Sequence, residues 1–270
     1  MDREKIREQR KLNRIKKKRK KLTVFLILRL LVILCMIDQG FNGNWNNVLL
    51  CILTLVLFTL PSLISKKFNI TFPKPLEIIV YLFIFSSEIL GEIQNFYGIF
   101  SHWDTILHTL NGFLCAAIGF SLVDILNNND NLNFKVSPAF AAIVAFSFSM
   151  TVGVLWEFAE YSIDKYFTTD MQKDRIITTI KTVKLKPNHD NPPLKIEDIK
   201  RTEVYYNNGD DILIIKDGYL DIGLIDTIKD LYVNFIGAVV FSSIGYLYIK
   251  NRDEYKFVEK FLPKLNKNNK

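Results

Sequence analysis

Histidine and cysteine are scarce in this 270-residue chain, with three of each. Cys35, Cys51 and Cys115 all lie within apolar blocks and share no metal-ligand spacing. This pattern predicts cysteines that pack, and it argues against both a disulfide framework and a thiolate zinc site. Three histidines are too few for a histidine-rich metal centre, so carboxylates are the expected main ligands of any bound ion.

The chain also lacks the composition that is typical of an ordinary soluble enzyme. Apolar residues make up 49% of the chain, 21 residues are Phe, and the mean hydropathy is positive. Long apolar blocks of this kind indicate a polytopic membrane protein. The net charge of +7 does not indicate a nucleic-acid partner, because 12 of the 35 Lys and Arg residues lie in the first 21 positions and 7 more follow Ile249.

Six apolar blocks approach the roughly 20 residues that cross a hydrocarbon core. The first block carries Arg29, and no small-x-small cleavage pattern follows it, so we interpret it as a retained anchor rather than a signal peptide. The predicted fold is an all-α integral membrane protein with a bundle of about six transmembrane helices. The blocks are Leu22 to Ile37, Val48 to Ser65, Leu76 to Phe96, Trp103 to Leu126, Pro138 to Tyr161 and Asp226 to Ile249.

The short connections between these blocks differ in Lys and Arg content. With a cytoplasmic N-terminus, the two short outer loops, residues 38–47 and 97–102, carry none. The positive-inside rule therefore predicts that both termini are cytoplasmic, with the lipid bilayer as the main partner. The resulting division is a basic tail (1–21), five helices (22–161), an outer insertion (162–225), the sixth helix (226–249) and a second basic tail (250–270).

The outer insertion holds 10 Lys and Arg residues, but 11 Asp and Glu residues balance them, and long segments are translocated largely regardless of charge. Thr202 to Tyr206 and Asp211 to Ile215 flank an Asn-Asn-Gly-Asp turn, which predicts a β-hairpin. Arg175 to Lys186 alternates as a third strand. We expect a small β-rich extracytoplasmic insertion between the fifth and sixth helices, acting either as a lid or as an idle loop.

Ionisable side chains recur at the ends of the last three apolar blocks. On the most lenient insertion scale each such group costs roughly 2.5–3.5 kcal/mol at membrane depth, so we expect these groups to be functional. The three constellations are Asp104-x-x-x-His108, Glu157-x-x-Glu160-x-x-x-Asp164 and Asp226-x-x-x-Asp230-x-x-x-Asn234.

The predicted orientation puts all three constellations at one depth, in the outer part of the membrane. Residues at i, i+3 and i+4 share a helix face, so each constellation forms one polar stripe. Stripes that faced lipid would leave their charges without partners, which predicts that they converge on one pocket. Glu88 and Glu92 of the third block could join it.

Several carboxylates and one imidazole in one cavity cannot all stay ionised without compensation. Either a divalent cation neutralises them, or some are protonated and suited to proton relay or acid-base work. Each residue alone also has a structural explanation: the aspartates as helix caps or solvated ends, and His108 as a hydrogen-bonded core histidine. Gly112 and Gly237 follow His108 and Asn234 closely and predict close helix packing.

The leading hypothesis is an outer-facing pocket that binds a divalent cation. As an enzyme the protein would be a metal-dependent hydrolase or transferase acting on a lipid or envelope substrate, with Glu157 and Asp104 as catalytic residues, Asp104 by orienting His108. Asn234 would support the pocket through hydrogen bonds. The predicted metal ligands are His108, Glu157, Glu160, Asp226 and Asp230.

Two alternatives stay open. A cation- or proton-coupled transporter would use the same carboxylates, but the chain has no detectable inverted repeat. Asp124, at the inner end of the fourth block, is the only candidate for an acceptor on the inner side. A non-catalytic scaffold or sensor would use the β-rich insertion to bind a partner. The sequence does not determine the oligomeric state.

Three strings resemble the YjdF-like family of small bacterial inner-membrane proteins. They are residues 103–112 (D-x-x-x-H-x-x-x-G), 156–160 (W-E-x-x-E) and 226–237 (D-T-x-x-D-x-x-x-N-x-x-G). The resemblance covers roughly the third to sixth blocks and implies a bacterial inner-membrane location, the helical fold and the importance of these positions. It supplies no reaction, and the segment between Glu160 and Asp226 is longer here than in the family.

Overall fold

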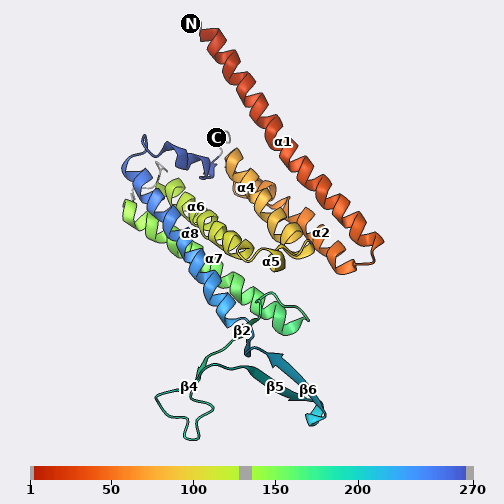
Figure 1. Cartoon of the computed structure of the whole chain (residues 1–270). Coiled ribbons are helices and arrows are strands. Elements are labelled where there is room, and N and C mark those ends of the chain that lie inside the picture. Colours follow the sequence, from red (N-terminus) through yellow and green to blue (C-terminus); the bar gives the residue numbers. More distant parts are fainter. Residues whose placement is uncertain (1–2, 128–135, 266–270) are drawn as a thin grey trace. The chain divides into compact units, whose positions relative to one another are not determined.

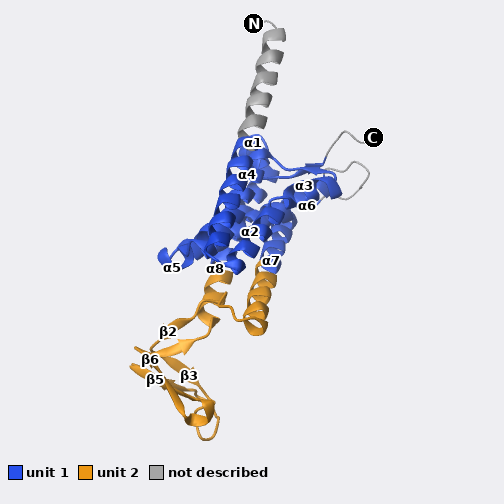
Figure 2. Ribbon diagram, turned by 90° about the vertical axis from the view of Figure 1, so that its right-hand side faces the viewer, with its two compact units in different colours: residues 1–152, 233–270 blue, residues 153–232 orange. Residues whose placement is uncertain are grey.

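The computed structural model describes the backbone of residues 3–127 and 136–265, with side chains from Leu22 onward (Figure 1). The chain divides into two compact units, coloured separately in Figure 2. We call residues 1–152 and 233–270 the helical unit, and residues 153–232 the strand unit. The main helices are α1 (Arg3–Phe41), α2 (Trp45–Leu57), α3 (Leu60–Lys67), α4 (Lys74–Phe85), the π-helix η1 (Ser86–Ile93), α5 (Phe96–Ile99), α6 (Trp103–Asn127), α7 (Pro138–Tyr166) and α8 (Leu224–Lys250).

Among the described residues, five helical segments are long and apolar enough to cross a membrane. Five of the six predicted blocks correspond to them. The remaining block, the third in the chain, is Leu76 to Phe96. It folds as α4 followed by η1, and the 12 residues of α4 rise only about 18 Å. The exact number of spans therefore stays a prediction. The five segments are Leu22–Phe41, Trp45–Lys67, Trp103–Asn127, Pro138–Tyr166 and Leu224–Lys250.

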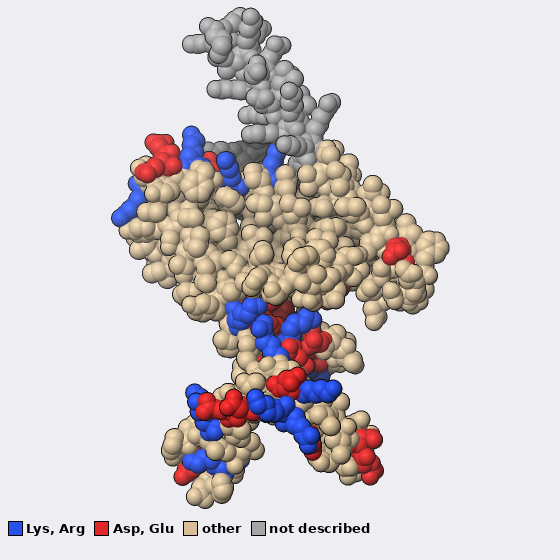
Figure 3. Space-filling view, in the orientation of Figure 1, with Lys and Arg blue, Asp and Glu red and all other residues tan. Residues whose placement is uncertain are grey.

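Apolar side chains cover much of the helical unit's surface. Leu26, Leu30 and Leu34 repeat along one face of α1, and each is more than half exposed. On the face shown in Figure 3 the helical unit is mostly tan, and its charged residues lie at its edges. An apolar surface this extensive suits the acyl chains of a lipid bilayer rather than water.

The glycines of α6 and α8 bring these two helices into backbone contact. A Cβ added to Gly112 would lie 2.1 Å from the carbonyl oxygen of Asn234, and one added to Gly237 would lie 2.0 Å from that of Thr109. Only glycine fits at either position. The prediction of close helix packing at Gly112 and Gly237 is confirmed.

The strand unit contains the predicted hairpin. Strands β5 (Arg201–Tyr206) and β6 (Asp211–Lys216) pair antiparallel with Tyr206 opposite Asp211. Asn207 and Asn208 have positive φ angles of 50° and 59°, which asparagine tolerates in tight turns. The hairpin prediction is confirmed.

The prediction of one third strand over Arg175 to Lys186 is wrong. That segment forms two short strands, β2 (Arg175–Ile177) and β3 (Ile180–Thr182), which pair with β7 (Tyr219–Asp221) and β4 (Leu194–Ile196) respectively. Strands of three residues show too little alternation to be separated by sequence pattern, and the partner of β2 is distant in the chain. The described chain also contains β1 (Ile70–Thr71) paired with β8 (Lys264–Leu265).

We expect Gly112→Ala and Gly237→Ala each to destabilise the protein by about 2–3 kcal/mol, because the methyl group meets backbone that cannot rotate away. Thermal unfolding of the detergent-solubilised protein measures the effect. Gly40→Ala is the matched control, since a Cβ there meets only Val48 Cγ2 at 4.0 Å. Equal melting temperatures for all three variants would contradict the close crossing.

Candidate functional site

The first two turns of α6 carry the acid-imidazole pair. Asp104 Oδ1 lies 3.3 Å from His108 Nε2, and the two side chains are 22% and 12% exposed. The i, i+4 spacing puts both on one face of the helix, as expected. An aspartate in this position holds the imidazole in one orientation and favours a proton on Nε2.

Asn234 joins three helices of the helical unit beside the glycine crossing. It is 1% exposed, its Oδ1 accepts a hydrogen bond from Asn111 Nδ2 at 3.2 Å, and its Nδ2 donates to the carbonyl of Ser149 at 3.5 Å. Ser149 Oγ in turn donates to the carbonyl of Gly112 at 2.8 Å. These bonds fix α8 against α6 and α7 at this level. Sequence reasoning missed Asn111, whose partner is 123 positions away.

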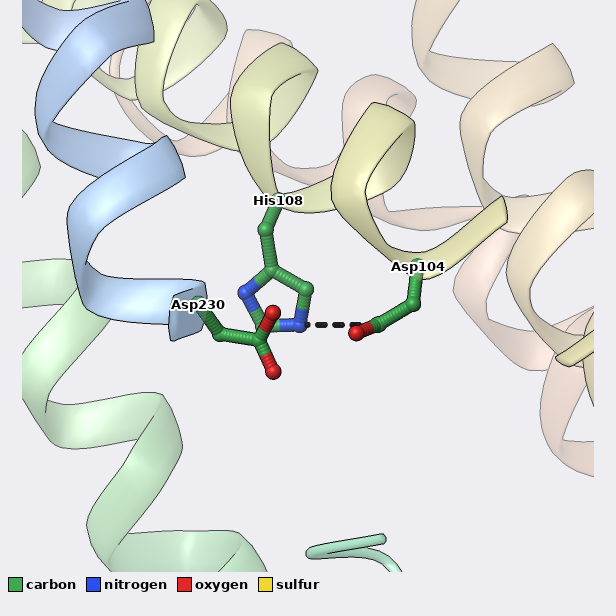
Figure 4. A group of neighbouring side chains, drawn as sticks. All are labelled: Asp104, His108 and Asp230. Atoms are coloured by element: carbon green, nitrogen blue, oxygen red, sulfur yellow. Dashed lines mark ion pairs between the residues drawn. The ribbon is translucent and has the colours of Figure 1, made fainter. Parts of the chain in front are cut away.

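Asp230 lies one helical turn before Asn234 on α8, which runs without interruption from Leu224 to Lys250. Figure 4 shows Asp104, His108 and Asp230 together, and one ligand atom of each lies within 4.8 Å of the other two. Asp230 is 2% exposed, and Lys229 Nζ lies 3.9 Å from its Oδ1.

The other predicted ligands lie at the end of α7 and at the start of α8. Glu157 and Glu160, on the last turns of α7, are 4% and 8% exposed, and Trp156 Nε1 donates to Glu160 Oε1 at 2.7 Å. Asp226 is in the first turn of α8 and is 4% exposed. The roles of these three as metal ligands stay predictions.

The π-helix η1 carries the remaining acidic pair. Glu88 is half-buried and Glu92 is exposed. Ser87 Oγ lies 3.3 Å from the hydroxyl of Tyr97, whose ring packs so closely on Gly91 that an added Cβ would lie 2.4 Å from it. π-Helical turns are frequent at functional sites, but the participation of Glu88 and Glu92 in the pocket also stays a prediction.

Comparison with known proteins identifies the family. Residues 21–251 match the model of a family described as "Predicted membrane protein (DUF2238)". The chain belongs to this family. The resemblance to the YjdF-like family agrees with membership of DUF2238 and stays a prediction at that finer level.

One relative of this DUF2238 member is an uncharacterized protein of Thermotoga maritima, 29% identical over 105 residues. The match covers 39% of this chain and 52% of the relative, so it spans about half of the relative's length. No solved structure matches the chain.

Two aspartates at helix ends hold one loop of the strand unit. Asp164 accepts hydrogen bonds from the backbone amides of Met171 and Gln172, each at 2.8 Å. Asp226 accepts from the next amide, that of Lys173, at 3.0 Å and from Arg175 Nη2 at 3.1 Å. Three consecutive amides are thus bound by carboxylates of α7 and α8. The sequence signal was only the acidic residue at each helix end.

Asp226→Asn should loosen this loop, because the new amide group replaces one acceptor oxygen by a donor facing Lys173 or Arg175. Hydrogen bonds to a charged group contribute about 1.5–3 kcal/mol, so we expect trypsin to cleave after Lys173 and Arg175 at least roughly tenfold faster. Peptide mass spectrometry measures the cleavage. Asp210→Asn, in the exposed hairpin turn, is the control. Equal cleavage rates for the two variants would mean that the hydrogen bonds of Asp226 do not hold the loop.

Proposed function

We propose that this membrane protein binds a divalent cation through Asp104, His108 and Asp230. As an enzyme it would use the ion in a hydrolase or transferase reaction on a lipid or envelope substrate. The observation that supports the proposal is the meeting of two carboxylates and one imidazole within 4.8 Å, at the end of two apolar helices. Such groups are expensive in an apolar environment unless they are paired or coordinated.

The donor chemistry fits a divalent ion. Carboxylate oxygens suit Mg²⁺ and Mn²⁺, and the imidazole also admits Zn²⁺ or Fe²⁺. Ligand atoms around one ion at about 2.1 Å lie roughly 3–4 Å apart, so small side-chain rotations bring this group into range. Three protein ligands leave positions for water and substrate, and a bound ion would polarise the substrate and acidify that water.

Asp104 has two roles that are compatible with its contact to His108. If His108 binds the ion through Nδ1, Asp104 orients the ring through Nε2, as the sequence predicts. If His108 binds through Nε2, Asp104 becomes a ligand itself. Glu157 is the proposed acid-base residue, and Glu160 and Asp226 are further proposed ligands; in the strand unit Asp226 is also paired with Arg175.

A metal-free alternative has a specific observation behind it. Lys229 Nζ, 3.9 Å from Asp230, carries a positive charge that compensates part of the pocket's negative charge. Neutralisation by Lys229 and by a protonated His108 would make the group an internal ion-pair network rather than a metal site. Metal content separates the two.

The carrier alternative is disfavoured by the inner end of α6. Asp124, the one predicted inner acceptor, lies 2.6 Å from Arg252 Nη2, which engages its charge within the protein. For the orientation, we propose a bacterial inner membrane with both termini in the cytoplasm, on the strength of the Lys and Arg asymmetry between short loops.

We expect the purified protein to carry about one Mn²⁺ or Zn²⁺ per chain and to be stabilised by added metal, by about 2.7 kcal/mol at a hundredfold excess over Kd. Asp230→Asn and His108→Ala should abolish both effects. Glu157→Gln tests the contribution of α7, and Asp210→Asn is the exposed acidic control. Elemental analysis and thermal unfolding are the measurements. The absence of metal from the wild-type protein, or equal stabilisation of Asp230→Asn and wild type by added metal, would exclude the proposed cation site.

Proteoliposomes separate the enzyme from the carrier. If the ion is a resident cofactor, radioactive Mn²⁺ should bind the protein at about one ion per chain without accumulating in the vesicle lumen. Accumulation that saturates with Mn²⁺ and disappears in Asp230→Asn would favour the carrier. Lumenal counts after removal of external metal distinguish transport from binding.

A further inference from the structure

The described residues that follow α8 pack against the helical unit. Residues 251–265, which we call the C-terminal strap, turn back through the short helix Lys256–Lys260 to strand β8. Val258 and Leu262 of the strap are 0% and 3% exposed. Both belong to the same apolar cluster as Phe120 and Phe241, so the strap is part of the core of the helical unit.

Polar contacts tie the strap to α6. Ser121 Oγ donates a buried hydrogen bond of 2.7 Å to the carbonyl of Pro263. Arg252 Nη2 pairs with Asp124 Oδ1 at 2.6 Å. The hydrogen bond to the Pro263 carbonyl is buried, and the guanidinium-carboxylate pair has a directional geometry. Both contacts hold the strap in one position.

The strap is also tied to the segment between α3 and α4. Strand β8 pairs antiparallel with β1, and Thr71 lies opposite Lys264. Phe261 of the strap meets Phe113 of α6 edge to face, with ring centroids 5.4 Å apart. In Figure 1 the strap is the dark blue segment after α8.

Helix α6 sets which end of the helical unit the strap covers. Asp104 and Asp124 are 20 residues apart on one continuous helix, which corresponds to about 30 Å. The strap therefore lies at the end of α6 opposite to the Asp104–His108 pair. In the predicted orientation this is the cytoplasmic end.

We infer that the C-terminal strap is a latch that keeps the Asp124 end of the helical unit closed to water and ions. Access to the unit's polar residues then does not run through this end. The inference is independent of metal binding, because it rests on the apolar and polar contacts of the strap alone. A carrier would therefore have to release the strap in each cycle.

Thiol labelling of the full-length, detergent-solubilised protein tests the latch. In a background with Cys35, Cys51 and Cys115 replaced by Ala, Val123→Cys reports on the covered end, because Val123 is 8% exposed in the cluster that contains Val258, and Glu254→Cys reports on the exposed strap surface. A water-soluble maleimide should label Glu254→Cys rapidly and Val123→Cys at least a hundredfold more slowly. Comparable rates would overturn the inference, because they would mean that the end is open.

Strap variants then test whether the strap is what protects Val123→Cys. Val258→Asp puts a charge into the buried side of the strap, and Phe257→Asp is the matched control on its 46% exposed side. We expect Val258→Asp to speed labelling at least tenfold and Phe257→Asp to leave it unchanged. Arg252→Gln, a milder change, should speed labelling several-fold in a protein that keeps its elution volume on size exclusion. Unchanged protection in Arg252→Gln and Val258→Asp would overturn the latch.

Discussion

The backbone contact between α6 and α8 is the constraint on which the site depends. Gly112 and Gly237 remove the two side chains that would hold the helices apart. His108 lies one turn before Gly112 on α6, and Asn234 lies three residues before Gly237 on α8. Polar residues next to such a crossing are held at short distance, and the bonds of Asn234 to Asn111 and Ser149 fix the level at which the helices meet.

Charged groups at the helix ends fall into two kinds. Asp124 and Asp226 each face an arginine from another segment, Arg252 and Arg175. Their charges serve to hold the strap and the loop of the strand unit. Asp104 and Asp230 instead lie close to the imidazole of His108, and Lys229 lies beside Asp230. This second group is the one for which we propose a divalent cation.

The two ends of α6 are built differently. One end carries the acid-imidazole pair, and the other is packed under Val258 and Leu262 and joined to the strap by Ser121. At this second end the charge of Asp124 is paired within the protein, because Arg252 Nη2 lies 2.6 Å from its Oδ1. The apolar surface of the helical unit suits the acyl chains of a lipid bilayer.

The sequence alone determined the membrane character, five of the described spanning segments, the hairpin at Asn207-Asn208-Gly209, the shared face of Asp104 and His108, and the close packing at Gly112 and Gly237. All of these follow from local periodicity, turn chemistry or the size of one side chain. Tertiary structure decided the partners: Asn111 with Asn234, the loop amides with Asp164 and Asp226, the short strands, and the strap over Ser121. Apart from the amides bound by Asp164, which lie seven and eight positions away, these contacts join residues well separated in the chain. The identity of a partner across such a distance depends on how the elements pack rather than on any repeat that one helix or strand displays.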